Sequence, residues 1–97
     1  MPTYISLLHY TKQGMENIKD SPARLDEAKQ AFKAMGAEIK GYYLTMGQYD
    51  AVVVLDAPDD ETIAKLALSI GSQGSISTET LRAFPEKEYR KLIAALP

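Results

Sequence analysis

The 97-residue chain contains no cysteine and only one histidine, His9. Without cysteine it can form no disulfide bond, no thiolate zinc site and no iron–sulfur cluster. A single histidine also excludes any site that needs several imidazole groups from one subunit. We therefore expect no cofactor and no metal centre in this chain.

Basic segments and long apolar runs are absent as well. Lysine and arginine total 11, aspartate and glutamate total 13, and the net charge is −2. Nucleic-acid binding normally leaves a basic patch, and a membrane-spanning helix needs roughly 20 apolar residues. The N-terminal residues also lack the basic region of a signal peptide. We expect a cytoplasmic protein that binds neither nucleic acid nor membranes, with one domain over residues 1–97.

Patterns that favour strands alternate with patterns that favour helices. The sequence predicts strands at residues 3–10, 39–46, 49–56 and 76–84, with a two-residue turn at 47–48. It predicts long helices over residues 21–35 and 58–70, a short helix that begins at residue 85, and one helical turn around residues 15–18 in the polar segment 11–20. This order is the βαββαβ pattern of an α+β, ferredoxin-like fold: a four-stranded antiparallel sheet with both long helices on one face, plus a C-terminal helix. The first and third strands should lie at the centre of the sheet.

The third predicted strand is apolar on both of its faces. Val52 and Val54 point one way, and Ala51, Val53 and Leu55 point the other way. The two long helices can cover only one face, and soluble monomers rarely expose such a patch. We therefore expect a homo-oligomer, most simply a dimer or a multiple of dimers that associate through the open sheet face. The alternative is that the C-terminal helix folds back over this face.

Three groups of residues suggest chemistry and have simpler interpretations. The acids Asp56, Asp59, Asp60 and Glu61 could bind a divalent cation, but helix capping explains them better because their spacing matches no EF-hand loop. The loop 71–75 follows a helix, so it favours a flexible turn over a phosphate cradle. His9 could act as a general base, although a structural role for it is favoured.

Tyrosine is abundant, with six residues, and five of them fall on or beside predicted strands. A tyrosine can orient a small organic molecule in a pocket, but it is also simply a favourable strand and interface residue. Arg24 lies in the first turn of its predicted helix, where the helix dipole is unfavourable for a cation. Its position suggests a specific partner, such as Asp50 or an acidic ligand.

The motif G-x-Y-D at residues 47–50 resembles the signature of the GYD-domain proteins. Further matches in order and spacing are T-x-Q-G at 11–14, S-P-x-R at 21–24, A-P-D-D at 57–60 and TETLRAF at 78–84. The resemblance covers nearly the whole chain, and the loop 71–75 is its main departure. It implies a ferredoxin-like fold and carries over no established activity. The chain is more distantly similar to the ligand-sensing domain of feast/famine regulators, which binds small effectors at subunit interfaces, but it lacks their DNA-binding domain.

We expect a ligand site near the hairpin and the long loop after the first strand. Its candidate residues are Tyr10, Thr11, Gln13, Arg24, Tyr49 and Asp50. Arg24 would pair with a carboxylate of the ligand, Tyr49 would pack against it, and Asp50 would fix the hairpin or accept a hydrogen bond. The favoured function is an oligomeric small-molecule-binding or sensing module with its site at a subunit or sheet cavity. The alternatives are a cofactor-independent monooxygenase-like or isomerase enzyme that uses His9 and the tyrosines, and a scaffold that only assembles.

Overall fold

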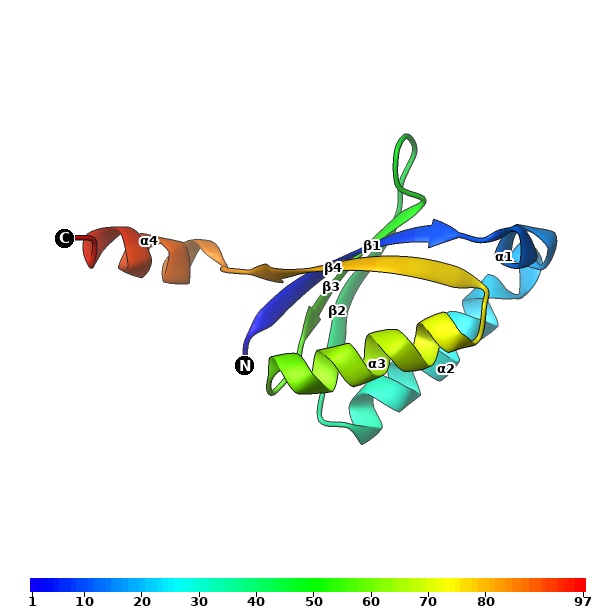
Figure 1. The fold of residues 1–97 in the computed structure, drawn as a ribbon, viewed down its shortest axis with the longest axis horizontal. Helices are drawn as coiled ribbons and strands as arrows, with labels where there is room; N and C mark the ends of the chain where they lie inside the picture. Colours follow the sequence, from blue (N-terminus) through cyan, green and yellow to red (C-terminus); the bar gives the residue numbers. More distant parts are fainter.

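The computed structural model describes all residues 1–97 and has the predicted order of elements (Figure 1). The elements are β1 (Thr3–Tyr10), α1 (Lys12–Glu16), the 3-10 turn η1 (Ile18–Asp20), α2 (Ser21–Ala34), β2 (Glu38–Leu44), β3 (Ala51–Asp56), α3 (Asp60–Ser72), β4 (Ile76–Ala83) and α4 (Glu86–Ala94). The polar segment after β1 therefore holds one more helical element than the single turn that was predicted.

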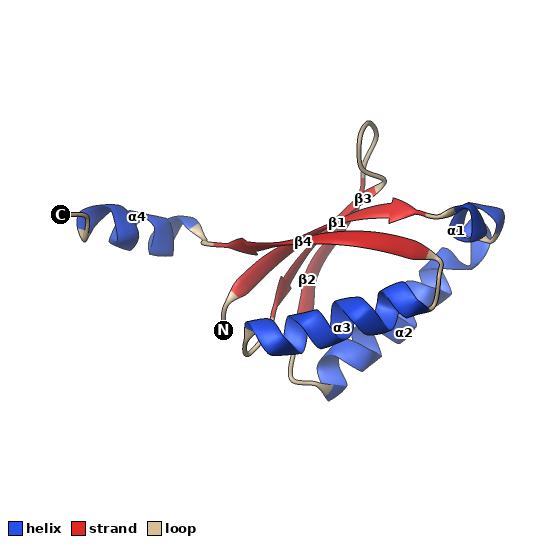
Figure 2. Cartoon of the chain, in the orientation of Figure 1, coloured by secondary structure: helices blue, strands red, loops and turns tan.

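The four strands form one antiparallel sheet in the order β2-β3-β1-β4, so β1 and β3 are central as predicted. Helices α2 and α3 lie side by side against one face of this sheet (Figure 2). This arrangement is the predicted α+β, ferredoxin-like fold. No helix combines the length and the apolar character that crossing a membrane requires.

The hairpin between β2 and β3 is longer than the predicted two-residue turn. The strands end at Leu44 and begin again at Ala51, so the connection spans residues 45–50. The Thr45 amide donates to the Asp50 carbonyl at 2.9 Å, and the Thr45 hydroxyl donates to the Tyr49 carbonyl at 2.6 Å. These bonds close a wider loop, which the predicted turn at 47–48 did not anticipate.

The core lies between the sheet and the two long helices. Tyr4 and Leu8 from β1 and Val53 and Leu55 from β3 are buried there. They meet buried side chains of the helices, which are Phe32 from α2 and Ile63 and Leu66 from α3. The helices therefore cover the face of β1 that carries Tyr4 and Leu8, a choice that the sequence pattern had left open.

The other sheet face, called the open face below, is not covered by any helix. Its central residues are Ile5, Leu7, Val52, Val54 and Leu81. Ile5 lies directly opposite Val54 on β3 and Leu81 on β4, and Leu7 lies opposite Val52. Directly opposite residues share a face of the sheet. The apolar second face that the sequence predicted is therefore present.

The acids before and within the start of α3 stabilise the fold locally. The Asp59 carboxylate accepts hydrogen bonds from the Thr62 amide at 2.8 Å and the Thr62 hydroxyl at 2.7 Å. These bonds hold the pKa of Asp59 below its ordinary value. Asp60 and Glu61 lie in the first turn, where the helix dipole favours negative charge. The capping interpretation is confirmed for Asp59, and the dipole interpretation fits Asp60 and Glu61, whereas Asp56 lies on β3 and contacts Thr3 and Lys40 instead.

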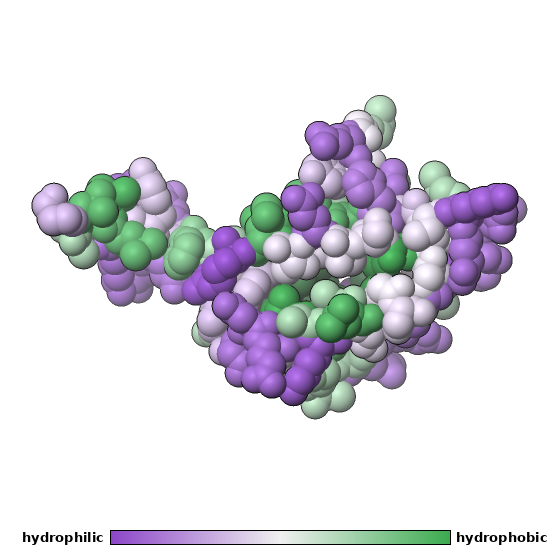
Figure 3. Space-filling view, viewed as in Figure 1, coloured by the Kyte–Doolittle hydropathy of each residue, from purple (hydrophilic) through white to green (hydrophobic).

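Helix α4 projects away from the rest of the molecule (Figure 1). Its apolar side chains, which are Tyr89, Leu92 and Ile93, are each at least half exposed. Apolar side chains gather on this projecting helix in the space-filling view (Figure 3). The alternative that the C-terminal helix folds back over the open face is therefore wrong for this structure.

Candidate functional site

A cavity of about 160 Å³ lies between the sheet and helices α2 and α3. Most of the residues that line it are apolar, and they come from both layers. Three of them have very short side chains, namely Ala28 and Ala31 on α2 and Ala67 on α3. Because these alanines stand where larger side chains would fill the space between the layers, the cavity remains.

Two pairs of hydroxyl groups from the sheet line the same cavity. The Tyr10 and Tyr42 hydroxyls are 2.8 Å apart, and the Ser6 and Thr80 hydroxyls are 3.2 Å apart. Burial, and then the hydrogen bond to Tyr10, raise the pKa of Tyr42 above its ordinary value. Tyr42 is therefore neutral at physiological pH. Each hydroxyl has one proton, so within each pair one O–H remains to donate to another group.

Arg24 is the one arginine that lines this cavity. The residue is half-buried, and its guanidinium donates to the Asn17 carbonyl at 3.2 Å. None of the four ion pairs in the chain includes Arg24, so the suggested pairing with Asp50 does not form. Glu27 also lines the cavity, but its side chain is exposed and does not pair with Arg24.

The T-x-Q-G residues join α1 to the loop before β4. Thr11 caps α1 by accepting a hydrogen bond from the Gly14 amide at 3.1 Å, and its hydroxyl donates to the Gly74 carbonyl at 2.5 Å. A Cβ atom on Gly14 would lie 2.0 Å from the Ser75 carbonyl oxygen, so only glycine fits there. The Gln13 side chain lies against Gly74, which has a φ of +86°. Thr11 and Gln13 thus contact this loop rather than the cavity.

The Y-D pair of the hairpin motif contacts β1 and β4. The Tyr49 ring lies 4.9 Å from the His9 ring, centroid to centroid, and its hydroxyl donates to the Glu79 carboxylate at 2.9 Å. The Asp50 carboxylate accepts a hydrogen bond from the Tyr10 amide at 2.8 Å. Tyr49 and His9 therefore lie at one end of the open face, and His9 does not line the cavity.

The six predicted ligand-binding residues occupy different places. Tyr10 and Arg24 line the cavity together. Thr11, Gln13, Tyr49 and Asp50 do not line it, and each forms the structural contacts described above. A role in ligand binding stays a prediction for all six. Sequence reasoning missed Ser6 and Thr80 and noted Tyr42 only as one of the strand tyrosines that could line a pocket, because the register that brings these side chains together across the strands is not specified by any local pattern. The alanines of α2 and α3 could have indicated, from the sequence alone, that the space between the helices and the sheet is incompletely filled.

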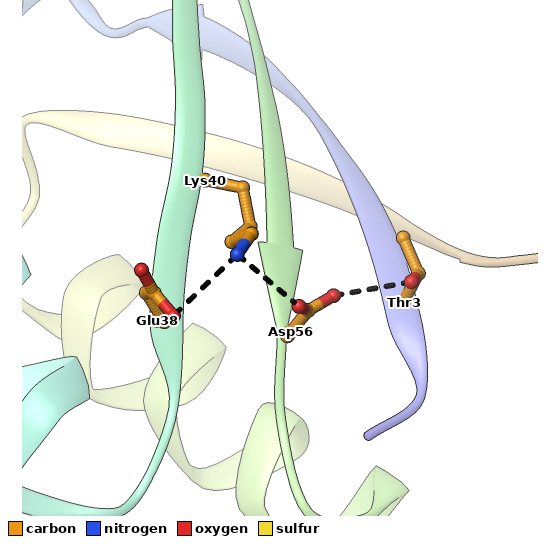
Figure 4. Close-up of polar contacts among 4 residues, drawn as sticks. All are labelled: Thr3, Glu38, Lys40 and Asp56. Carbon is orange, nitrogen blue, oxygen red and sulfur yellow. Dashed lines mark hydrogen bonds and ion pairs between the residues drawn. The ribbon is translucent and has the colours of Figure 1, made fainter. Parts of the chain in front are cut away.

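Polar groups flank the open face at both ends. At one end, the Thr3 hydroxyl donates to the Asp56 carboxylate at 3.1 Å, and Lys40 lies between Glu38 and Asp56 at 3.7 and 4.0 Å (Figure 4). At the other end stand His9 and Tyr49, and the Tyr49 hydroxyl reaches Glu79, which lies on the edge strand β4 directly opposite Leu7. The open face thus has an apolar centre between two polar ends, which makes it the second candidate site of the molecule.

Two solved structures resemble this chain in fold and support its assignment to the α+β, ferredoxin-like class. The crystal structure of FFRP-DM1 has a TM-score of 0.60 and 20% identity, covering 87% of this chain and 100% of that chain. A crystal structure of a protein from Thermus thermophilus has a TM-score of 0.55 and 23% identity, covering 87% and 94% respectively. At these identities the likeness shows the fold alone, and the fold is the one that the distant similarity to feast/famine regulators implied.

The GYD domain family model matches residues 4–93, and the chain belongs to the GYD domain family. A relative from Thermus thermophilus is 37% identical over 86 residues, which is 88% of this chain and 90% of that protein. That relative is named glutamine synthetase and cystathionine beta-lyase binding protein. The family resemblance that the motifs indicated is confirmed.

Proposed function

We propose that this chain is a homo-oligomeric binding module in which two copies associate through their open faces. The observation that carries the proposal is the uncovered apolar centre formed by Ile5, Leu7, Val52, Val54 and Leu81. Leu81 is 45% exposed in the single chain. Contiguous apolar surface of this kind normally marks an interface.

The distribution of polar groups on the open face supports a second copy as its occupant. Interfaces have an apolar centre with a polar rim, and a two-fold axis brings the same patch of each copy together. Here the polar groups stand at the two ends, around Asp56 and around His9, and on the edge strand β4 at Glu79. Sheets that stack face to face lie about 10 Å apart, which lets short aliphatic side chains such as Val52 and Val54 interdigitate.

A small molecule and a partner protein complete the proposed function. The cavity with Tyr10 and Arg24 on its wall supports the binding of a small molecule within each copy. The relative named for binding glutamine synthetase and cystathionine beta-lyase supports a partner enzyme for this chain as well. We also propose that residues 1–97 form a single domain and that the protein works in the cytoplasm.

Thermal unfolding over a wide range of protein concentration tests the self-association. Unfolding of an obligate dimer is coupled to its dissociation, so the melting temperature rises with protein concentration. We expect such a rise for this chain. A melting temperature that stays constant across the range would contradict the proposed dimer.

The partner enzyme has a separate test. Purified glutamine synthetase is the probe that the relative's name supplies, and surface plasmon resonance with the immobilised chain gives the readout. Saturable binding is expected, with an unrelated oligomeric enzyme as the control. Equal responses to both enzymes would count against a specific protein partner and would leave the dimer untouched.

A further inference from the structure

We propose that the cavity between α2, α3 and the sheet binds a small monoanion with an apolar body of about one ring. Arg24 would contact the anionic group. The inference rests on the proposed binding of a small molecule and assigns its location and chemical class. Three properties of the cavity lead to this class: its volume, its distribution of polar groups and the pairing state of Arg24.

The volume sets the size of the ligand. The cavity measures about 160 Å³. An apolar cavity of about 150 Å³ is large enough to bind benzene. The body of the ligand is therefore a single aromatic ring or a short branched aliphatic chain. Fused ring systems and nucleotides are too large for the space as it stands.

Arg24, the only cationic residue of the lining, lies with Tyr10 at one end of the cavity, whereas apolar residues line its whole length, including Ile76 directly opposite Tyr10. Tyr10 ends β1, and Arg24 lies in the first turn of α2, so both stand near α1. Phe32, Leu55 and Ile63 line the cavity farther from α1, where α2 ends and α3 begins. A ligand with one polar end and one apolar end fits this distribution, and its polar end would lie beside Arg24.

The charges at the polar end favour an anion. A guanidinium has five N–H donors, and the structure uses Arg24 for one hydrogen bond to a carbonyl and for no ion pair. A half-buried guanidinium that lacks a carboxylate gains strongly from one, because charge-assisted bonds are about twice as strong as neutral ones. Glu27, an exposed carboxylate that also lines the cavity, repels any anion and repels a dianion more strongly than a monoanion. One negative charge is therefore favoured over two.

One uncharged donor strengthens the same end. The Tyr10 and Tyr42 hydroxyls use only one of their two protons for each other. The remaining proton can bond the second oxygen of a carboxylate held by Arg24. The position and charge of Arg24 and the free hydroxyl proton of the tyrosine pair thus all favour a carboxylate that carries a ring-sized apolar group.

Phenylacetate, phenylacetamide and acetate are the probes that test this assignment. Their binding is measured by titration of amide resonances in ¹⁵N–¹H spectra of the full chain. We expect phenylacetate to bind at least about tenfold more tightly than phenylacetamide, which has no charge, and than acetate, which has no apolar body. Equal affinities for phenylacetate and phenylacetamide would overturn the assignment of an anion.

Variants of α2 locate the site. Arg24→Gln should weaken phenylacetate about tenfold or more and leave phenylacetamide unchanged, and Arg24→Lys should restore part of the loss. Lys29→Gln is the matched control, because Lys29 is an exposed cation of the same helix that does not line the cavity. A loss of the same size in Lys29→Gln would show that general charge, rather than this site, binds the probe.

Filling the cavity provides a second, independent measurement. Ala28→Met and Ala67→Met, made separately on different helices, should each abolish binding of phenylacetate. Spectra with native dispersion establish that each variant is folded, and two positions guard against one failing to fold. Unchanged binding in a folded variant would place the ligand elsewhere and overturn the inference.

The same samples separate this inference from the proposed function. If the chain is oligomeric and binds none of the probes, the assigned ligand class is wrong and the dimer stands. If the chain is monomeric and binds phenylacetate with the expected variant effects, the ligand site stands and the dimer is wrong.

Discussion

Along β3, neighbouring residues have different surroundings on the two faces of the sheet. Val53 and Leu55 lie beneath the helices and are 6% and 3% exposed, whereas Val52 and Val54 lie on the open face and stay partly accessible. Burying an aliphatic side chain fully contributes about 1.5–3 kcal/mol to stability. In a single copy of the chain, only the side chains beneath the helices are buried enough to contribute this full amount. Strand β3 is thus apolar on both faces, and the second copy proposed above would cover the open one.

The two faces also differ in how completely they are filled. The covered face has a cavity lined by alanines and paired hydroxyls, and the open face has an aliphatic centre with polar ends. A cavity accommodates a small guest, whereas a broad aliphatic surface suits a large partner. The two faces therefore support two different binding events in one chain.

Charged substitutions at two adjacent residues of β3 give the largest expected difference between the two faces of the sheet. Val53→Asp places an unpaired carboxylate in the core and should lower the free energy of unfolding by about 4 kcal/mol or more. Val54→Asp should cost about 1 kcal/mol in the folded single chain, because its side chain can reach water, but should abolish self-association. Urea unfolding and size-exclusion chromatography measure the two effects. If both variants unfolded to the same degree, the distinction between the faces would fail.

The junction of α1 with β4 closes one end of the covered layer and depends on Gly14. Gly14→Ala would bring a methyl group against the Ser75 carbonyl, and we expect a loss of about 3 kcal/mol in urea unfolding. Gly71→Ala is the matched control in α3, where a Cβ would meet nothing within 4 Å. There we expect a gain of up to about 1 kcal/mol, since alanine favours helix. Equal stabilities for the two variants would contradict the tight contact.

Asp50, the last residue of the hairpin loop, links this loop to the end of β1. Asp50→Ala leaves the Tyr10 amide without its partner and should cost about 1–3 kcal/mol. Asp50→Asn keeps an acceptor oxygen at the same place and should recover most of this loss. Chemical denaturation of both variants measures the difference. An Asn variant as unstable as the Ala variant would mean that the charge, rather than the hydrogen bond, matters.

Titration of Tyr4 gives an effect that is confined to alkaline pH and concerns the covered face alone. Burial, and then the hydrogen bond to Asp60, raise the pKa of Tyr4 from 10.0 to about 12. Because the folded state favours the neutral phenol, this stabilisation is complete below pH 10 and is lost as the pH rises to about 12. In Tyr4→Phe that part of the alkaline loss should be missing when unfolding is followed against pH. Parallel curves for the two proteins would exclude this role.

Local patterns predicted much of the fold because each one has a local physical cause. The run Ala51–Leu55 indicated a central strand, and Asp59 indicated the start of α3. The hairpin was misjudged because its width depends on the bonds of Thr45 across the loop. A sheet cavity was predicted, but its lining was only partly identified: Tyr10 and Tyr42 are 32 positions apart, and their contact depends on the register of β1 and β2 against β3, which no local pattern specifies.

The direction of α4 could not be predicted for a different reason. Its amphipathic pattern correctly indicated a helix, but the pattern does not say which surface the apolar side meets. In the structure Pro85 holds an extended backbone, and the helix points away from the sheet. The apolar side of α4 has no partner within one chain.

Sedimentation equilibrium of the native chain tests the central claim, that the open face joins two copies, most directly. We predict a mass of twice 10.7 kDa, or a multiple of that value, at micromolar concentration, and 10.7 kDa for Val54→Asp. A mass of 10.7 kDa for the native chain at every concentration would contradict this claim.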